Sequence, residues 1–61
     1  MTDIECLRIL LTAMAQCGNA RISTTFCGQE DDYDLYLTYD SAVAENSQGI
    51  EILSVPKEEE E

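Results

Sequence analysis

Carboxylates are the side chains in this 61-residue sequence whose number and spacing could do chemistry. Thirteen residues are Asp or Glu, three are Lys or Arg, none is His, and the formal net charge is -10. Four carboxylates stand close together at Glu30, Asp31, Asp32 and Asp34. Such a group could act in acid–base catalysis, hold a cation, or occupy a protein site that is built for phosphates.

Catalysis and metal binding fit this sequence poorly. Histidine, the commonest general base, is absent, and no nucleophile elbow, phosphate-binding loop or zinc-peptidase motif occurs. Carboxylates need burial before their pKa values move into a catalytic range, and an exposed cluster offers none. Residues 30–34 also lack the twelve-residue spacing and the final glutamate of a calcium loop. We therefore expect no enzyme activity, no metal and no cofactor.

Three cysteines, Cys6, Cys17 and Cys27, form no recognisable site. Their odd number, wide spacing and lack of histidine neighbours argue against a disulfide framework and against a zinc site. On one helix, Cys6 and Cys17 would lie about 16 Å apart, which is too far for a bond. We expect small buried thiols in a reducing compartment.

Residues 2–17 predict an amphipathic helix. Thr2 and Glu5 have the spacing of a capping box, which satisfies two amide groups at the helix start. Gly18 and Asn19 supply the stop, because both tolerate the left-handed conformation. The apolar side chains that fall on one helical face are Ile4, Leu7, Leu11 and Met14.

The next two segments predict an antiparallel hairpin. Residues 20–27 and 33–40 alternate apolar and polar side chains, and a polar loop of five residues joins them. Residues 41–48 are compatible with a short helical turn or with a loop. Residues 50–55 predict a third strand, which Pro56 ends.

The sequence does not decide which side of the third strand faces the helix. Ile50 and Ile52 point to one side, whereas Leu53 and Val55 point to the other. Either a β-bulge shifts the register, or both faces are partly covered.

These elements predict an α+β fold, with one N-terminal helix packed on a three-stranded antiparallel sheet in the order α-β-β-β. Residues 1–56 would form a single domain, and residues 57–61 an acidic disordered tail. Residues 1–56 hold nine acidic and two basic residues, a net charge of -7, so the tail is not the main source of the acidity. A domain of this size buries only about 60% of its unfolded surface, which leaves no room for an enclosed active site.

One sheet face should pack on the helix, and the other should carry the charge. We expect the helix-facing side chains to be Ile22, Phe26, Leu35, Leu37, Ile50 and Ile52. Alternate side chains of a strand are about 6.7 Å apart, similar to successive phosphates of a nucleic acid, and Tyr36 adds an aromatic anchor. The candidate partner-binding residues are Glu30, Asp31, Asp32, Asp34, Tyr36, Asp40, Glu45 and Glu51. The plainer alternative is a solvated face that prevents association of sheet edges.

In this profile the chain resembles the small, acidic, phage-encoded anti-CRISPR proteins, and more narrowly those of DNA-mimic type that act on type I systems such as I-C. The resemblance covers residues 2–55 and rests on the helix, the sheet and the acidic cluster Glu30, Asp31, Asp32, Asp34 and Asp40. It implies an inhibitor in the cytoplasm of a bacterial host, which binds the basic DNA-entry or PAM-recognition surface of the Cascade complex, on its large subunit. Target DNA would be excluded by competition, without direct binding of nucleic acid by this chain.

Other interaction proteins share this profile. A small acidic interaction or assembly module, such as a phage or bacterial regulator, could dimerise through its helix or through Leu53 and Val55 on the open face. An anti-restriction or antitoxin-like protein would use the same physics on another target. We expect a monomer rather than a dimer. No apolar run is long enough to span a membrane, and an acidic surface is repelled by anionic lipids.

Overall fold

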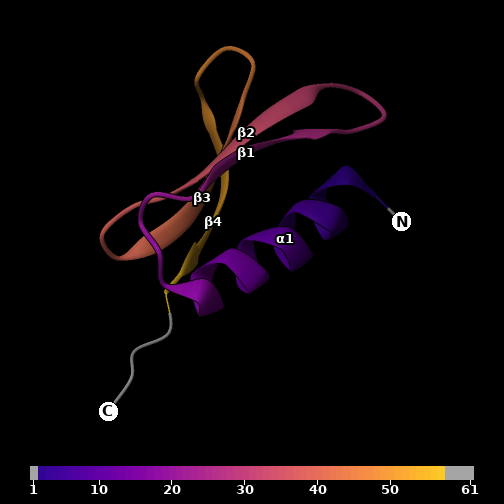
Figure 1. Cartoon of the computed structure of the whole chain (residues 1–61). Helices are drawn as coiled ribbons and strands as arrows, with labels where there is room; N and C mark the ends of the chain where they lie inside the picture. Colours follow the sequence, from indigo (N-terminus) through magenta and orange to yellow (C-terminus); the bar gives the residue numbers. More distant parts are fainter. Residues whose placement is uncertain (1, 58–61) are drawn as a thin grey trace.

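The computed structural model describes residues 2–57 and shows one helix lying across one face of a four-stranded antiparallel sheet (Figure 1). The elements in chain order are α1 (Asp3–Cys17), β1 (Ser23–Cys27), β2 (Asp32–Leu37), β3 (Ser41–Asn46) and β4 (Glu51–Pro56). The strands lie side by side in chain order, so consecutive strands form hairpins. The α+β class is confirmed. The predicted tail lies outside the described residues from position 58 onward.

Helix α1 begins and ends where the sequence indicates. The Thr2 hydroxyl accepts a hydrogen bond from the Glu5 backbone N–H, and the Glu5 carboxylate accepts one from the Thr2 N–H, both at 3.2 Å. This is the predicted capping box. Gly18 follows the helix with φ 72°, and its N–H donates to the Met14 carbonyl at 3.3 Å. A left-handed residue here favours glycine, which explains the stop.

Strand β3 corrects the expected number of strands from three to four. Residues 41–48 were expected to be a helical turn or a loop, but Ser41–Asn46 pair with β2 on one side and β4 on the other. Ala42 and Ala44 are fully buried in the core. Because alanine has a small side chain, the inner strand β3 can lie close beneath α1, and this packing outweighs the weak strand preference of its alanines.

The core lies between α1 and the sheet. Leu7, Leu11 and Leu35 are completely buried. The partly buried side chains packed against the core are Ile22, Phe26, Leu53 and Val55. The predicted inward orientation of Ile22, Phe26, Leu35 and Leu37 is thereby confirmed.

The expected orientation of β4 is wrong. Ile50 and Ile52 are exposed, whereas Leu53 and Val55 pack against the core. The cause is a register shift next to Ala44: Ala44 pairs with Leu53, but the following residue, Glu45, pairs with Glu51. One residue of β4 is therefore extra at this point. This is a β-bulge, one of the two alternatives that the alternation of residues 50–55 allowed.

Candidate acidic binding face

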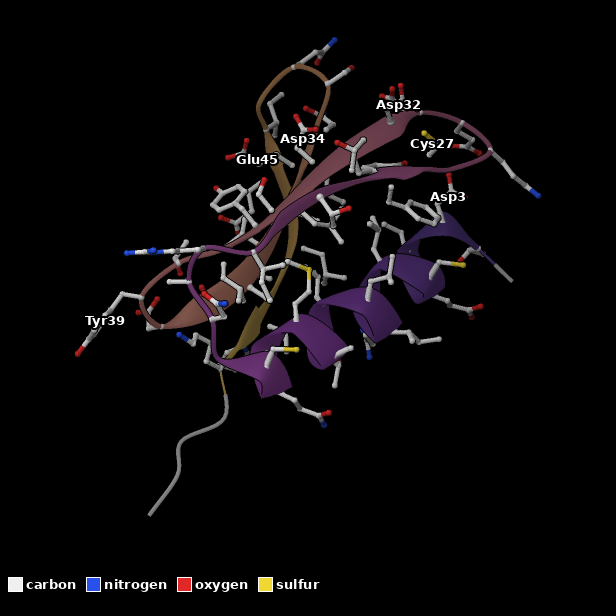
Figure 2. The ribbon with its side chains drawn as sticks, in the orientation of Figure 1. Asp3, Cys27, Asp32, Asp34, Tyr39 and Glu45 are labelled. Carbon is white, nitrogen blue, oxygen red and sulfur yellow. The ribbon has the colours of Figure 1, made fainter. Side chains whose placement is uncertain are left out.

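Carboxylates gather on the sheet face that α1 leaves uncovered, where Figure 2 shows Asp34 of β2 and Glu45 of β3. The register pairs Asp34 of β2 with Glu45 of β3, and Glu45 with Glu51 of β4. We call these three residues the acidic row. Side chains opposite one another on neighbouring strands have their β-carbons about 5 Å apart, and like charges in such pairs destabilise a sheet. Together with Asp32, two residues before Asp34, the row forms what we call the acidic face.

Neutral hydroxyl groups hold this row in place. The Tyr36 hydroxyl donates to Glu45 Oε2 at 2.7 Å, and the Thr25 hydroxyl donates to Asp34 Oδ1 at 3.3 Å. These bonds orient the carboxylates without cancelling their charge. The hydrogen bond to Glu45, desolvation and the charges of Glu45 and Glu51 raise the pKa of Tyr36 above its ordinary value. Tyr36 therefore stays a neutral donor at physiological pH.

The β1–β2 loop adds carboxylates at one end of this face. Asp31 accepts hydrogen bonds from the Asp32 N–H at 2.7 Å and from the Ser47 hydroxyl at 3.5 Å. Glu30 lines a hollow on the other side, between the loop and the start of α1. Burial raises the pKa of Tyr33, and the charges of Asp3, Asp31 and Glu30 raise it further. The negative potential thus continues around this end of the molecule.

Asp40 does not join the cluster, contrary to expectation. Strand β2 ends at Leu37 instead of continuing to position 40, and Asp40 lies in the β2–β3 turn beside Tyr39. Figure 2 shows Tyr39 at the end of the sheet opposite Asp32. The Thr38 N–H closes this turn on the Ser41 carbonyl at 2.7 Å, and the Thr38 hydroxyl stabilises it by accepting the Ser41 N–H at 3.0 Å. The other predicted partner-binding residues lie on the acidic face or in its adjoining loop, except that Glu30 faces the hollow.

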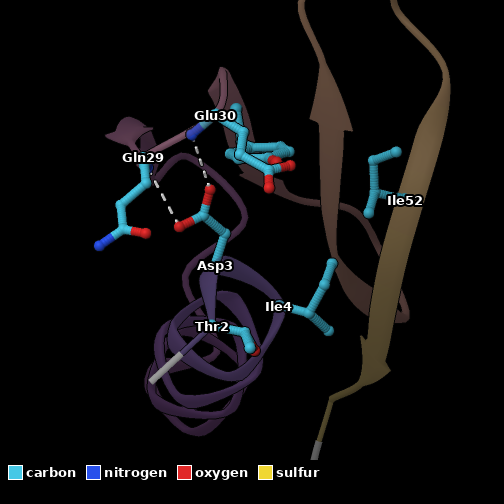
Figure 3. Close-up of a pocket in the computed structure, with 7 residues that line it drawn as sticks. Thr2, Asp3, Ile4, Gln29, Glu30 and Ile52 are labelled. Atoms are coloured by element: carbon cyan, nitrogen blue, oxygen red, sulfur yellow. Dashed lines mark hydrogen bonds between the residues drawn. The ribbon is translucent and has the colours of Figure 1, made fainter.

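Asp3 fastens the loop to the helix, a feature that the sequence did not indicate. Its carboxylate accepts hydrogen bonds from the backbone N–H groups of Gln29 at 3.1 Å and Glu30 at 3.2 Å (Figure 3). A β-carbon at Gly28 would overlap the Asp3 carboxylate, so glycine permits this approach. The sequence indicates this contact only by a glycine directly after a strand, and that glycine does not show which residue approaches it.

The cysteines are less buried than expected. Cys6 is half-buried, but Cys17 and Cys27 are exposed and all three are free. Cys17 ends α1 and Cys27 ends β1, where little of the chain covers them. In residues 2–57, no three or more His, Cys, Asp or Glu side chains are grouped to hold a metal ion. Over the same range, α1 is neither long nor apolar enough for a membrane span.

The acidic face can form charge-assisted hydrogen bonds with lysine or arginine side chains. Its outward carboxylates keep free acceptor positions, because the donors found on Asp34 and Glu45 are single hydroxyl groups. Comparison of the chain with protein-family models, with curated proteins and with solved structures gave no match.

Proposed function

We propose that the protein is an inhibitor that occupies the nucleic-acid-binding surface of another protein with its acidic face. The acidic row carries this proposal: Asp34, Glu45 and Glu51 lie on adjacent strands and repel one another. Such a row lowers the stability of a small domain. A basic partner surface would relieve the repulsion, so the arrangement is favourable in a complex.

The resemblance to DNA-mimic anti-CRISPR proteins supplies the partner. Cascade binds target DNA through basic surfaces, and the row would take the place of phosphates against their lysines and arginines. Tyr36, half-buried and fixed by Glu45, would add a rigid aromatic contact in the middle of the face. The alternative is a small acidic interaction module that uses the same face on a different basic protein.

Competition with DNA tests this function. Purified type I Cascade would be mixed with labelled target DNA and increasing amounts of the protein. We expect the wild type to displace the DNA, and the triple variant Asp34→Asn, Glu45→Gln, Glu51→Gln to require at least about tenfold more protein, because each lost charge pair weakens the complex. Added salt should weaken inhibition by the wild type.

A control of equal charge separates the face from the overall acidity. The variant Glu59→Gln, Glu60→Gln, Glu61→Gln has the same net charge as the row variant, -7 in place of -10. It should inhibit almost as well as the wild type. Equal loss in both variants would show that only net charge matters, and full inhibition by the row variant would refute the proposal. No binding to Cascade, with capture of another basic protein through the row, would support the alternative.

A further inference from the structure

The hollow between the start of α1 and the β1–β2 loop is a second surface, separate from the acidic row. It has a volume of about 440 Å³, within the range of about 300–1,000 Å³ that is usual for small-ligand sites. Figure 3 shows Asp3 and Glu30 on one side of it and Ile4 and Ile52 on the other. Tyr33 of β2 also lines it. Carboxylates, apolar side chains and a phenol thus meet in one concave place.

Tyr33 brings a polar group without a partner to this hollow. The residue is only 8% exposed, and its ring packs against Phe26 with the ring centres 6.1 Å apart. The structure shows no hydrogen bond to the Tyr33 hydroxyl among residues 2–57, and no side-chain oxygen in this range is fully buried without a partner. The hydroxyl is therefore the end of the side chain that still reaches the hollow. A ligand bound there would supply the partner that the protein does not.

The electrostatics of the hollow favour a cation. Burial raises the pKa of Tyr33, and the negative charges of Asp3, Asp31 and Glu30 raise this pKa further. The negative potential that opposes a phenolate at this position favours a positive group beside the neutral hydroxyl. An anion fits poorly, because it would meet the same carboxylates and because the capping box already uses two N–H groups of the helix start.

Glu30 is the carboxylate of the hollow that has most capacity for a ligand. Asp3 accepts the N–H groups of Gln29 and Glu30 at 3.1 and 3.2 Å, so each of its oxygens already has a donor. These bonds fix the backbone of Glu30 beside the hollow. The structure shows no hydrogen bond to the Glu30 carboxylate from the described part of the chain, residues 2–57. Both oxygens of Glu30 can therefore accept from a ligand.

We propose that this hollow binds an arginine side chain of a partner protein. The planar guanidinium would donate two N–H groups to the Glu30 carboxylate and another to the Tyr33 hydroxyl. The aliphatic stem would lie against Ile4 and Ile52, which are 42% and 38% exposed and so have apolar surface left to cover. Lysine fits less well, because its ammonium is a point charge that does not pair with a carboxylate through two parallel hydrogen bonds.

The arginine site and the acidic face use different residues. None of the three residues of the acidic row lines the hollow, which lies on the helix side of the β1–β2 loop. A basic partner could contact both surfaces around this loop. Arginine binding in the hollow nevertheless does not depend on the proposed inhibition, and each can be measured without the other.

NMR titration of the full chain with Nα-acetyl-arginine amide tests the site, in about 0.15 M NaCl to limit non-specific attraction. We expect saturable shifts of the Ile4 and Ile52 methyl groups and of the Glu30 amide, with a Kd of about 1–10 mM, because a single side chain makes few contacts. The citrulline derivative has the same shape without the charge and should bind at least about tenfold more weakly. The lysine derivative should bind at least about threefold more weakly.

Matched variants locate the site. Glu30→Gln should weaken binding of the arginine derivative at least about fivefold, and Tyr33→Phe at least about threefold. The controls lie in the β2–β3 turn, where Asp40→Asn removes the same charge and Tyr39→Phe removes the same hydroxyl group. Both controls should bind the arginine derivative within about twofold of the wild type, because their side chains are far from the hollow. Circular dichroism checks the fold of each variant, and the citrulline comparison needs no variant.

Several results would overturn the proposal. One is the absence of saturable shifts at Ile4 and Ile52 up to about 50 mM of the arginine derivative. Another is equal binding of the citrulline or lysine derivative. Equal weakening by Glu30→Gln and Asp40→Asn would show that only net charge attracts the probe. The row variant described above should bind the arginine derivative as the wild type does while it loses inhibition, so failure of either proposal can be recognised separately.

Discussion

At the scale of single residues, the Asp3 carboxylate and Gly28 act as one joint between α1 and the β1–β2 loop. Gly28→Ala should displace the carboxylate from the Gln29 and Glu30 N–H groups, at a cost of about 1–2 kcal/mol in the free energy of unfolding. Urea unfolding measures this cost. In an Asp3→Ala background the same Gly28→Ala change should cost much less, because the clash is gone. Additive costs in this double-mutant cycle would disprove the joint.

The Tyr36–Glu45 hydrogen bond gives a pH dependence at the same scale. In the folded protein, the pKa of the Tyr36 phenol lies above the ordinary 10.0 of tyrosine. In the unfolded chain the phenol therefore ionises first as pH rises. The contribution of the Tyr36–Glu45 hydrogen bond to the free energy of unfolding is therefore complete below about pH 10. It is lost as pH rises through the raised pKa of Tyr36 in the folded protein.

The variant Tyr36→Phe tests the direction of this pH dependence. Above about pH 10, the free energy of unfolding should fall more steeply with pH in the wild type than in Tyr36→Phe, which has no proton to lose at this position. Urea unfolding at several pH values from neutral upward would show the difference. Equal slopes in the two proteins would mean that the bond to Glu45 contributes nothing to stability. Tyr33, whose pKa is also raised, should keep part of the decline in both.

At the scale of elements, β3 depends on small side chains beneath the helix. Ala44 is fully buried, and its partner across the strand pair, Leu53, packs against the same core. Ala44→Val should destabilise the domain by about 1–3 kcal/mol through overpacking, although valine is the better strand former. Thermal unfolding measures the change.

Ser54→Val is the matched control for this element. Ser54 pairs with Val43 and is exposed, so the same valine meets no helix there. Its effect should stay within about 0.5 kcal/mol or be slightly stabilising. If Ala44→Val is as well tolerated as Ser54→Val, the close approach of α1 is not what fixes β3.

The same element explains what the sequence could and could not predict. The helix follows from local signals, namely the capping box, the apolar spacing and Gly18, and β2 follows from its alternation. Strand β3 contains two alanines, a glutamate and an asparagine, which are poor strand formers when considered alone. Strand β3 forms because it pairs with strands on both sides and is buried under α1. Those contacts involve residues distant in the sequence, so the strand propensity of residues 41–46 alone does not predict them.

Most residues of the acidic face could be predicted from the sequence, but their arrangement across the sheet could not. Asp32, Asp34, Tyr36, Glu45 and Glu51 all lie on the open face, but their order across the sheet depends on β3 and on the bulge beside Glu45. Alternation placed Asp40 on the same face because it assumed a strand to position 40. The strand instead turns at residues 38–41, where Thr38 is hydrogen-bonded to Ser41, and the alternation of side chains does not indicate such contacts.

At the scale of the whole molecule, the acidity should appear as a dependence of thermal stability on salt. Raising NaCl from about 0.02 M to about 0.5 M shortens the screening length from about 20 Å to about 4 Å. The melting temperature of the wild type should rise, by about 4–8 °C for each kcal/mol of repulsion relieved. Calorimetry at one fixed protein concentration measures this rise, because any self-association would make the melting temperature depend on concentration.

The spacing of the charges decides how much each group of carboxylates contributes to the salt dependence of the melting temperature. The carboxylates of the acidic row are about one strand spacing apart, about 5 Å, so their mutual repulsion is strong at low salt. The row variant Asp34→Asn, Glu45→Gln, Glu51→Gln should therefore lose more of the salt dependence than the tail variant of equal net charge. Identical salt dependences would show that the fold responds only to its total of -10. A larger loss in the row variant would mean that the surface proposed to bind a basic partner is also the one whose charges destabilise the free protein most.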